Sequence, residues 1–179
     1  MLIYILVGFL AIIILFLIFV ALQPNDFRIT RAATVAAPPA IVFEQVNDLH
    51  KWNAWSPWAR MDPDARNTYE GPVAGVGASF AWAGNKKVGE GRMTITDSQP
   101  CERIGIKLEF FKPFVATNRV DFTFKPDGDQ TEIVWEMSGK NSFVGKIFTL
   151  LMSCDKMIGS QFEQGFSNLK SIVEIPVAT

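Results

Sequence analysis

The sequence predicts an α+β protein in which a curved antiparallel β-sheet wraps around one long carboxyl-terminal helix, with one transmembrane helix in front. Three observations support this fold class. Residues 2–22 are apolar and uncharged, three runs between residues 103 and 137 alternate apolar with polar positions, and residues 143–174 carry an apolar stripe at helical spacing. A sheet with one dry face needs a cover, and the terminal helix is long enough to supply it.

The N-terminal run, residues 2–22, contains 21 residues without a charge, an amide or a proline. At ~1.5 Å per residue it spans roughly 30 Å, the thickness of the hydrocarbon core of a bilayer. A cleaved signal peptide is the main alternative, but no Lys or Arg precedes the run and no Ala-x-Ala site follows it closely. We therefore expect an anchor over residues 1–22, a linker over 23–26 and one domain over 27–179.

The charges that flank the anchor predict its orientation. Arg28 and Arg31 follow the run, whereas only the amino terminus precedes it, so the positive-inside tendency places the domain in the cytoplasm. Cys101 and Cys154 are far apart in the sequence, in agreement with a reducing compartment. The expected protein is a single-pass membrane protein with a cytoplasmic domain.

The first part of the domain reads as a strand followed by two short helices. Alternation predicts a strand over residues 27–36, and Pro38 and Pro39 suit the first turn of the helix that follows. Asp48 is a candidate cap for a second short helix, which carries tryptophans and which Pro57 should end.

The remainder reads as a series of strands and one long helix. We expect strands over residues 78–83, 86–97, 103–110, 119–125 and 132–137. A helix should run from about residue 143 to 174, where Pro176 stops it. Its expected buried stripe consists of Ile147, Leu151, Ile158, Phe162, Phe166, Leu169 and Val173.

Several motifs give the chain a family resemblance from about Phe27 to Glu174. They are Ala37-Pro38-Pro39 before Val42-Phe43, Asn47-Asp48-Leu49 before Trp52, Trp55-Ser56-Pro57-Trp58, residues 84–93, Asp155-Lys156-Met157-Ile158-Gly159, Phe162-Glu163 and Leu169-Lys170. With these motifs the chain resembles the helix-grip superfamily of START-like lipid-binding and polyketide cyclase/dehydrase-like proteins (the SRPBCC group), and in particular a bacterial polyketide cyclase-like branch. The resemblance implies a helix-grip fold, but the superfamily includes carriers, receptors and enzymes.

Composition excludes several functional classes. Seventeen basic and eighteen acidic residues give a formal charge of -1, so we expect no nucleic acid partner. One histidine, His50, and two distant cysteines provide no zinc-ligand pattern, and no phosphate-binding loop or dinucleotide fingerprint is present. We expect no cofactor and no metal site. Catalytic residues remain unknown, because His50 stands in a polar helix junction where a surface role is the simpler interpretation.

A cavity between the helix and the sheet is the expected ligand site. Gly89 and Gly91 alternate onto the same face as Met93, where missing side chains would leave space for a ligand; a bend or bulge in the strand is the alternative. On this interpretation, Gly91→Leu should fill the cavity without unfolding the domain.

Other candidates for the cavity wall are aromatic, with one amide. Trp55, Trp82, Phe110 and Trp135 are candidates to line it, although packing in the core would explain them equally well. Asn118 alternates onto the dry face, where its amide needs a partner from the protein, a water or a ligand.

Three functions are compatible with these features. The first is membrane-anchored binding of a hydrophobic small molecule or lipid in the cavity. The second is an enzyme of the cyclase or aromatase type, in which polar groups steer proton transfers within a folded chain. The third is a membrane-tethered protein-interaction module whose cavity is filled by its own side chains.

Overall fold

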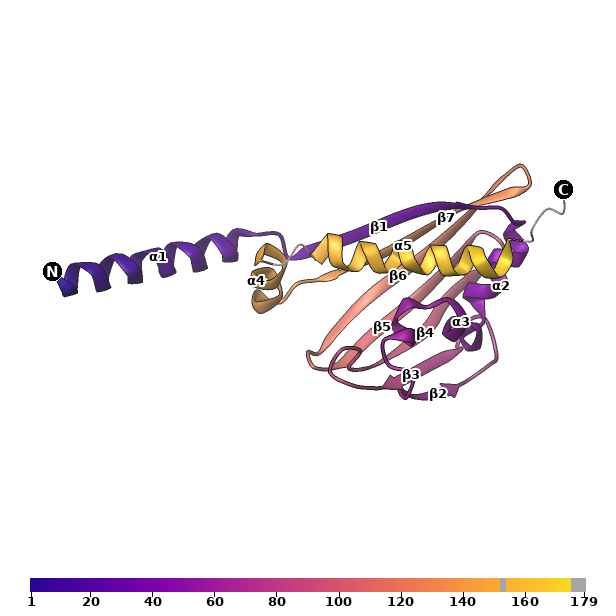
Figure 1. The fold of residues 1–179 in the computed structure, drawn as a ribbon, viewed down its shortest axis with the longest axis horizontal. Helices are drawn as coiled ribbons and strands as arrows, with labels where there is room; N and C mark the ends of the chain where they lie inside the picture. The colour runs from indigo at the N-terminus through magenta and orange to yellow at the C-terminus, as the bar shows by residue number, and fades with distance from the viewer. Residues whose placement is uncertain (152–153, 175–179) are drawn as a thin grey trace.

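The computed structural model describes residues 1–151 and 154–174. Within these residues, a seven-stranded antiparallel sheet curves around the carboxyl-terminal helix, and an apolar helix projects from one end of the domain (Figure 1). The predicted helix-grip fold class is confirmed.

Helices lie before the first strand, between the first and second strands, and after the last strand. They are α1 (Leu2–Leu22), α2 (Pro39–Asn47), η1 (Leu49–Lys51), α3 (Trp52–Trp55), η2 (Pro57–Arg60), α4 (Phe143–Leu151) and α5 (Cys154–Val173). The strands are β1 (Asp26–Val35), β2 (Arg66–Glu70), β3 (Ser79–Ala83), β4 (Glu90–Gln99), β5 (Arg103–Lys112), β6 (Ala116–Asp127) and β7 (Gln130–Lys140). Their order in the sheet is β1-β7-β6-β5-β4-β3-β2.

Two elements differ from expectation because their sequences carry weak signals. Strand β2 was not predicted, because its short sequence is polar and mostly exposed at the edge of the sheet. The strand expected over residues 86–97 begins later, at Glu90, because residues 84–89 form the hairpin turn. Pro57 ends α3 as predicted but also begins the short helix η2.

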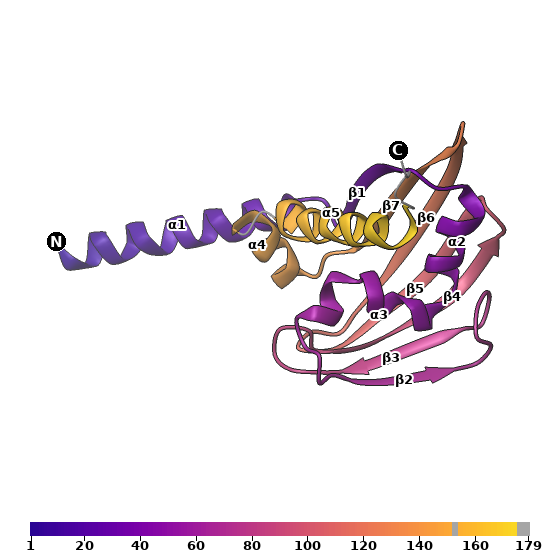
Figure 2. The same ribbon diagram turned by 45° about the vertical axis from the view of Figure 1, so that its right-hand side comes forward.

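Helix α1 is long and apolar enough to cross a bilayer, and a signal sequence near the N-terminus would have the same properties. Its side chains are exposed except for Val20, which is buried. Figures 1 and 2 show it extending away from the domain. Three residues, 23–25, separate it from β1.

The terminal helix was predicted to be continuous, and the structure instead has two helices, α4 and α5, separated by residues outside the described part. Figures 1 and 2 show α4 beside the end of α1, apart from the line of α5. The two helices have different partners: on α4, Lys146 donates a hydrogen bond through Nζ to the Ala21 carbonyl oxygen (3.2 Å), whereas α5 lies along β1. A helical stripe in the sequence does not distinguish these partners.

Helix α5 is fixed to β1 at both of its ends. Arg31 Nε lies 2.9 Å from Glu163 Oε1, and its Nη2 lies 3.0 Å from Asp155 Oδ2. At the other end, the Ala36 amide donates to Glu174 Oε1 (3.0 Å). The apolar side of α5 then faces the concave face of the sheet, where the predicted stripe residues Phe162, Phe166, Leu169 and Val173 are buried.

Candidate functional site

A cavity of about 470 Å³ lies between the concave face of the sheet, α5, and the segment formed by α3 and η2. Its inner wall is apolar and comes from strands β3 to β7 and from α5. The main contributors are Trp82, Met93, Leu108, Phe110, Trp135 and Phe162. A volume of this size is typical of small-molecule sites.

The cavity occupies only one half of the concave face. The half near the turns after β1 and β6 is filled by side chains, among which Ile104, Phe122 and Ile133 are fully buried. In the other half, Trp82 and Phe110 are only half-buried. The cavity thus lies in the half of the domain nearer to α1.

Of the residues predicted to line the cavity, Trp82, Met93, Phe110 and Trp135 lie in its wall. The other four, Trp55, Gly89, Gly91 and Asn118, lie outside the lining. Their positions have separate physical causes.

Gly91 lies on the concave face as expected, but Trp82 already occupies the space beside it. A Cβ at residue 91 would overlap the Trp82 ring and would lie 2.5 Å from the Glu109 carbonyl oxygen. The space that a side chain at residue 91 would fill is therefore occupied by the Trp82 indole ring. Gly91→Leu is consequently not a clean cavity-filling variant, because its side chain would collide with these atoms first.

Gly89 belongs to the β3–β4 hairpin and not to the strand that carries Met93. Its φ angle is +65°, and a Cβ there would overlap the Lys112 carbonyl oxygen. Both properties require glycine in a turn. Gly89 is therefore explained by the backbone geometry of a bend, the alternative given above, and not by space for a ligand.

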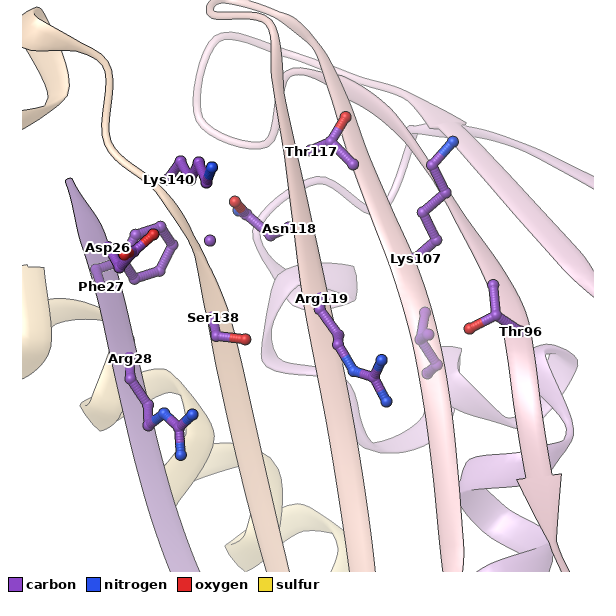
Figure 3. A pocket seen from close by; sticks show the side chains of 12 residues that line it. Asp26, Phe27, Arg28, Thr96, Lys107, Thr117, Asn118, Arg119, Ser138 and Lys140 are labelled. Atoms are coloured by element: carbon purple, nitrogen blue, oxygen red, sulfur yellow. The ribbon is translucent and has the colours of Figure 1, made fainter.

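Trp55 and Asn118 lie to either side of the cavity. Trp55 is fully buried in the filled half, where its Nε1 donates to the Gln45 carbonyl oxygen (3.1 Å). Asn118 is half-buried and lies against Gly139, where Phe27 is also close. It lines a separate hollow together with Phe27 and Lys140 (Figure 3).

Several lining residues were not among the predicted site residues. Leu108, Val120 and Met137 line the cavity, and the alternation of their strands does place them on the dry face. Trp58 and Phe162 come from η2 and α5. The sequence could have supplied the first three by periodicity, but the last two depend on how the helices dock.

The indole N–H groups of the tryptophans around the cavity differ in whether they have a hydrogen-bond partner. Trp52 donates to the Val46 carbonyl oxygen (2.8 Å), and Trp82 donates to that of Val88 (3.0 Å). The Nε1 of Trp135 is buried and has no hydrogen-bond partner among the described residues. The Trp135 ring stacks on Phe162, with ring centroids 4.1 Å apart. Trp135 is thus a wall residue that carries a buried donor without a partner in the described part of the chain.

Ionisable groups are few in the described lining and lie beside the β3–β4 hairpin. They are Asp62 and Lys87, and Asp62 Oδ2 accepts a hydrogen bond from the Asn85 amide (2.6 Å). The lining residue Asn53 donates to the Tyr69 hydroxyl (2.9 Å), and burial raises the pKa of Tyr69, which keeps the phenol neutral. His50 is exposed and stacks on Tyr69, outside the lining.

A second hollow, of about 820 Å³, is an open trough on the outer face of the sheet (Figure 3). Arg28, Arg119 and Ser138 lie in it, at positions that alternate with the buried ones along β1, β6 and β7. Arg119 Nε is 2.6 Å from Asp121 Oδ2, and Arg28 Nη1 is 3.4 Å from Glu136 Oε2. Because both of these arginines already have carboxylate partners, the trough is a weaker candidate than the interior cavity.

This combination of a curved sheet, a gripping helix and an apolar cavity agrees with a match between residues 26–174 and the family described as polyketide cyclase / dehydrase and lipid transport. The chain belongs to this family. No match was found among curated proteins.

Solved structures with a similar fold share little sequence with this chain. Protein CV1439 from Chromobacterium violaceum has a TM-score of 0.60 at 16% identity, covering 86% of this chain and 99% of that one. Protein MLL2253 from Mesorhizobium loti has a TM-score of 0.61 at 14% identity, covering 83% and 97%. DynU16, from the dynemicin biosynthetic locus, has a TM-score of 0.58 at 16% identity, covering 84% of this chain and 48% of its own. At these identities the likeness establishes the fold alone.

Proposed function

We propose that this chain binds an apolar small molecule or a lipid in the cavity between the sheet and α5, and that α1 anchors it in a membrane. The observation that carries the proposal is an apolar cavity of about 470 Å³ whose wall includes Trp135, a residue whose buried Nε1 has no partner among the described residues. A buried donor without a partner is destabilising, and an acceptor on a ligand removes that penalty. The proposed ligand therefore has an apolar body and at least one carbonyl, hydroxyl or ester oxygen.

Binding is favoured over catalysis by the chemistry of the wall. A cyclase or aromatase needs groups that transfer protons beside the reacting chain. The ionisable groups in the described lining, Asp62 and Lys87, stand beside a hairpin, and Asp62 is already bonded to the backbone. Cyclase-type chemistry remains the alternative function, because the family description includes cyclases as well as lipid transport.

The interaction module has less support, because the protein's own tryptophans fill only part of the concave face. Trp52 and Trp55 pack in the filled half, with ring centroids 4.7 Å apart. The cavity remains beside them. A module without a ligand would have no need of this volume.

A titration of the full chain in mild detergent with a dansyl-labelled fatty acid tests the proposal, with energy transfer from the tryptophans as the signal. Ala59 is half-buried on η2 and lines the cavity, whereas Ala81 is half-buried on the outer face of β3. We expect Ala59→Phe to weaken binding about tenfold or more, equivalent to about 1.4 kcal/mol. The matched variant Ala81→Phe should bind like the wild type.

Two results would contradict the proposal. Absence of binding to the wild type would favour the interaction module, and equal binding by Ala59→Phe and the wild type would place the ligand elsewhere. Turnover of the bound chain, detected by mass spectrometry of recovered ligand, would instead support the cyclase alternative.

The role of the Trp135 N–H is tested with two competitors of equal length, a long-chain ketone and the corresponding alkane. Trp135→Phe removes the donor and keeps an aromatic ring in the wall. We expect the ketone to compete about three- to tenfold less well against the variant, the effect of one hydrogen bond. Competition by the alkane should not change in the same proportion; an equal loss for both competitors would indicate altered packing.

A further inference from the structure

Three elements lie at the end of the domain from which α1 projects. They are α4, the β3–β4 hairpin (residues 84–89) and the β5–β6 hairpin (residues 113–115). We call these three elements together the anchor-side rim. Their common position follows from the strand register, because Asp26 at the start of β1 pairs with Lys140, and Phe110 pairs with both Gly91 and Ala116. Figures 1 and 2 show the two hairpins and α4 at the same end as α1.

The anchor-side rim exposes large apolar side chains. Val115 is 86% exposed and Phe114 is 63% exposed, and both belong to the β5–β6 hairpin. Among the described side chains, the large apolar residues exposed in the rim are Phe114, Val115, Phe143, Val144 and Leu150, and the exposed Phe111 lies close by at the end of β5. Large apolar side chains exposed at one end of a domain favour a contact with another apolar phase or with a partner.

Helix α4 has the polarity expected of a helix in contact with lipid. Among its described side chains, Phe143, Val144 and Leu150 are exposed, whereas Lys146 is buried with its Nζ on the Ala21 carbonyl oxygen. A helix surrounded by water has the opposite arrangement, with its lysine outside and its apolar residues inside. The contact also joins α4 to the end of α1, the proposed membrane helix.

Exposed cations accompany the apolar residues of the rim. Lys86 and Lys87 lie in the β3–β4 hairpin, and Lys140 ends β7. Lysines placed beside apolar residues match the chemistry of a membrane surface, because the ammonium groups reach the headgroup phosphates while the apolar side chains enter the acyl region.

The cavity is continuous with the rim. Lys87 and Val88 of the β3–β4 hairpin are lining residues. Along the concave face the side chains become more exposed toward this end, from the fully buried Phe122 to the half-buried Trp82 and Phe110. The ligand site is therefore least enclosed where the rim is.

We propose that the anchor-side rim docks on the bilayer that holds α1, so that the cavity takes up its ligand directly from that bilayer. This inference rests on the proposed function, since it assumes an apolar ligand and an anchored chain. The three-residue connection between α1 and β1 keeps the rim close to the membrane surface. Apolar exposure, cations and the less enclosed part of the cavity then coincide at one surface.

Docking is tested with an environment-sensitive NBD fluorophore on the full chain in vesicles of phosphatidylcholine and phosphatidylglycerol. Val115→Cys is labelled in a chain carrying Cys101→Ser and Cys154→Ala, and Val73→Cys is the matched control. Val73 is 66% exposed in the loop between β2 and β3, at the opposite end of the sheet. We expect a blue-shifted emission at residue 115 that nitroxide-labelled lipids quench, and neither effect at residue 73. Equal quenching of both sites by aqueous iodide would overturn the docking.

Uptake from the bilayer is tested by the rate at which the full chain takes a dansyl-labelled fatty acid from the same vesicles. Val115→Asp should slow this uptake severalfold, because a charge at the rim opposes insertion, whereas Val73→Asp should not. In detergent, where no bilayer is present, both variants should bind the same probe like the wild type. Normal vesicle uptake by Val115→Asp would refute the inference and leave ligand binding intact, whereas no binding by the wild type in detergent would refute the proposed function itself.

Discussion

Gly91 and Trp82 together determine the shape of the cavity wall near its less enclosed end. The indole ring of Trp82 covers Gly91, and its Nε1 is tied to the Val88 carbonyl oxygen. The ring is therefore held across the strand pair and cannot retreat freely. A glycine on a dry face can thus make space for the protein's own ring, which the alternation of a sequence does not reveal.

At Gly91, even the smallest side chain should be destabilising. Gly91→Ala places a methyl group against the Trp82 ring and 2.5 Å from the Glu109 carbonyl oxygen. We expect the free energy of unfolding to fall by about 1–3 kcal/mol, the usual range for overpacking. Chemical denaturation followed by circular dichroism measures this change; unchanged stability would show that the ring moves away easily.

The candidate site could be predicted from the sequence only in part. Alternation placed Met93, Phe110 and Trp135 on one face of their strands, Trp82 was proposed as an aromatic wall residue, and all four lie in the wall. It could not show which part of that face the helices leave open, so Trp55 was grouped with the wall although it lies in the filled half. The missing partner of Trp135 Nε1 is likewise a property of packing in three dimensions.

At the level of elements, the contact between α5 and the sheet depends on a close approach at Gly165. A Cβ there would lie 2.9 Å from Trp135 Cζ3, while Phe162 stacks on the face of the same ring. The rigid indole consequently holds the helix at a distance that only glycine permits. This contact connects the position of α5 to the wall of the cavity.

Gly165→Ala should destabilise the domain although alanine favours helices. The gain in helix propensity is about 1 kcal/mol, but the overlap with Trp135 should exceed it and leave a net loss of about 1–2 kcal/mol. Ser167→Ala, at an exposed position of the same helix, is the control and should be neutral. Thermal unfolding compares the two variants; a stabilised Gly165→Ala would show that helix and sheet separate at little cost.

The link between β1 and α5 should respond to acid. The Arg31 guanidinium, through a hydrogen bond and then through its charge, lowers the pKa of the exposed Asp155 carboxyl. A carboxyl with a lowered folded-state pKa stabilises the fold above its unfolded pKa of about 3.9, and this stabilisation is lost as the pH falls through the folded value. We therefore expect the melting temperature of the wild type to fall more steeply below about pH 4 than that of Asp155→Asn.

A double-variant cycle isolates the Arg31–Asp155 pair. In an Arg31→Gln background, Asp155→Asn should no longer change the slope of the melting temperature against pH. A slope difference that persists without Arg31 would assign the acid response to another carboxyl.

The elements of the fold could be predicted where local chemistry determined them. Proline at the start of α2 and alternation in β5, β6 and β7 gave the right element types, because a buried face imposes a regular spacing. The polar strand β2 has no such spacing, since it lies at the edge of the sheet. A helical stripe also does not encode that α4 contacts α1 whereas α5 lies along β1.

For the whole molecule, α1 should determine where the protein is found. The full chain should sediment with membranes and resist extraction by carbonate or high salt, because burial of about twenty apolar residues in lipid exceeds any peripheral contact. A chain beginning at Asp26 should be released into the soluble fraction. A mature protein that starts after residue 22 would instead identify α1 as a cleaved signal sequence.

The short connection between α1 and β1 limits how far a bound molecule can travel. Three residues reach at most about 10 Å, so with α1 in a membrane as proposed, residues 23–25 would hold the domain at the surface of that one membrane. A shuttle between separate membranes needs free diffusion or a long flexible tether, and the proposed anchor with its three-residue connection would provide neither. Its geometry suits local exchange, in which a molecule leaves the bilayer, is shielded from water and passes to a protein that comes to the same surface.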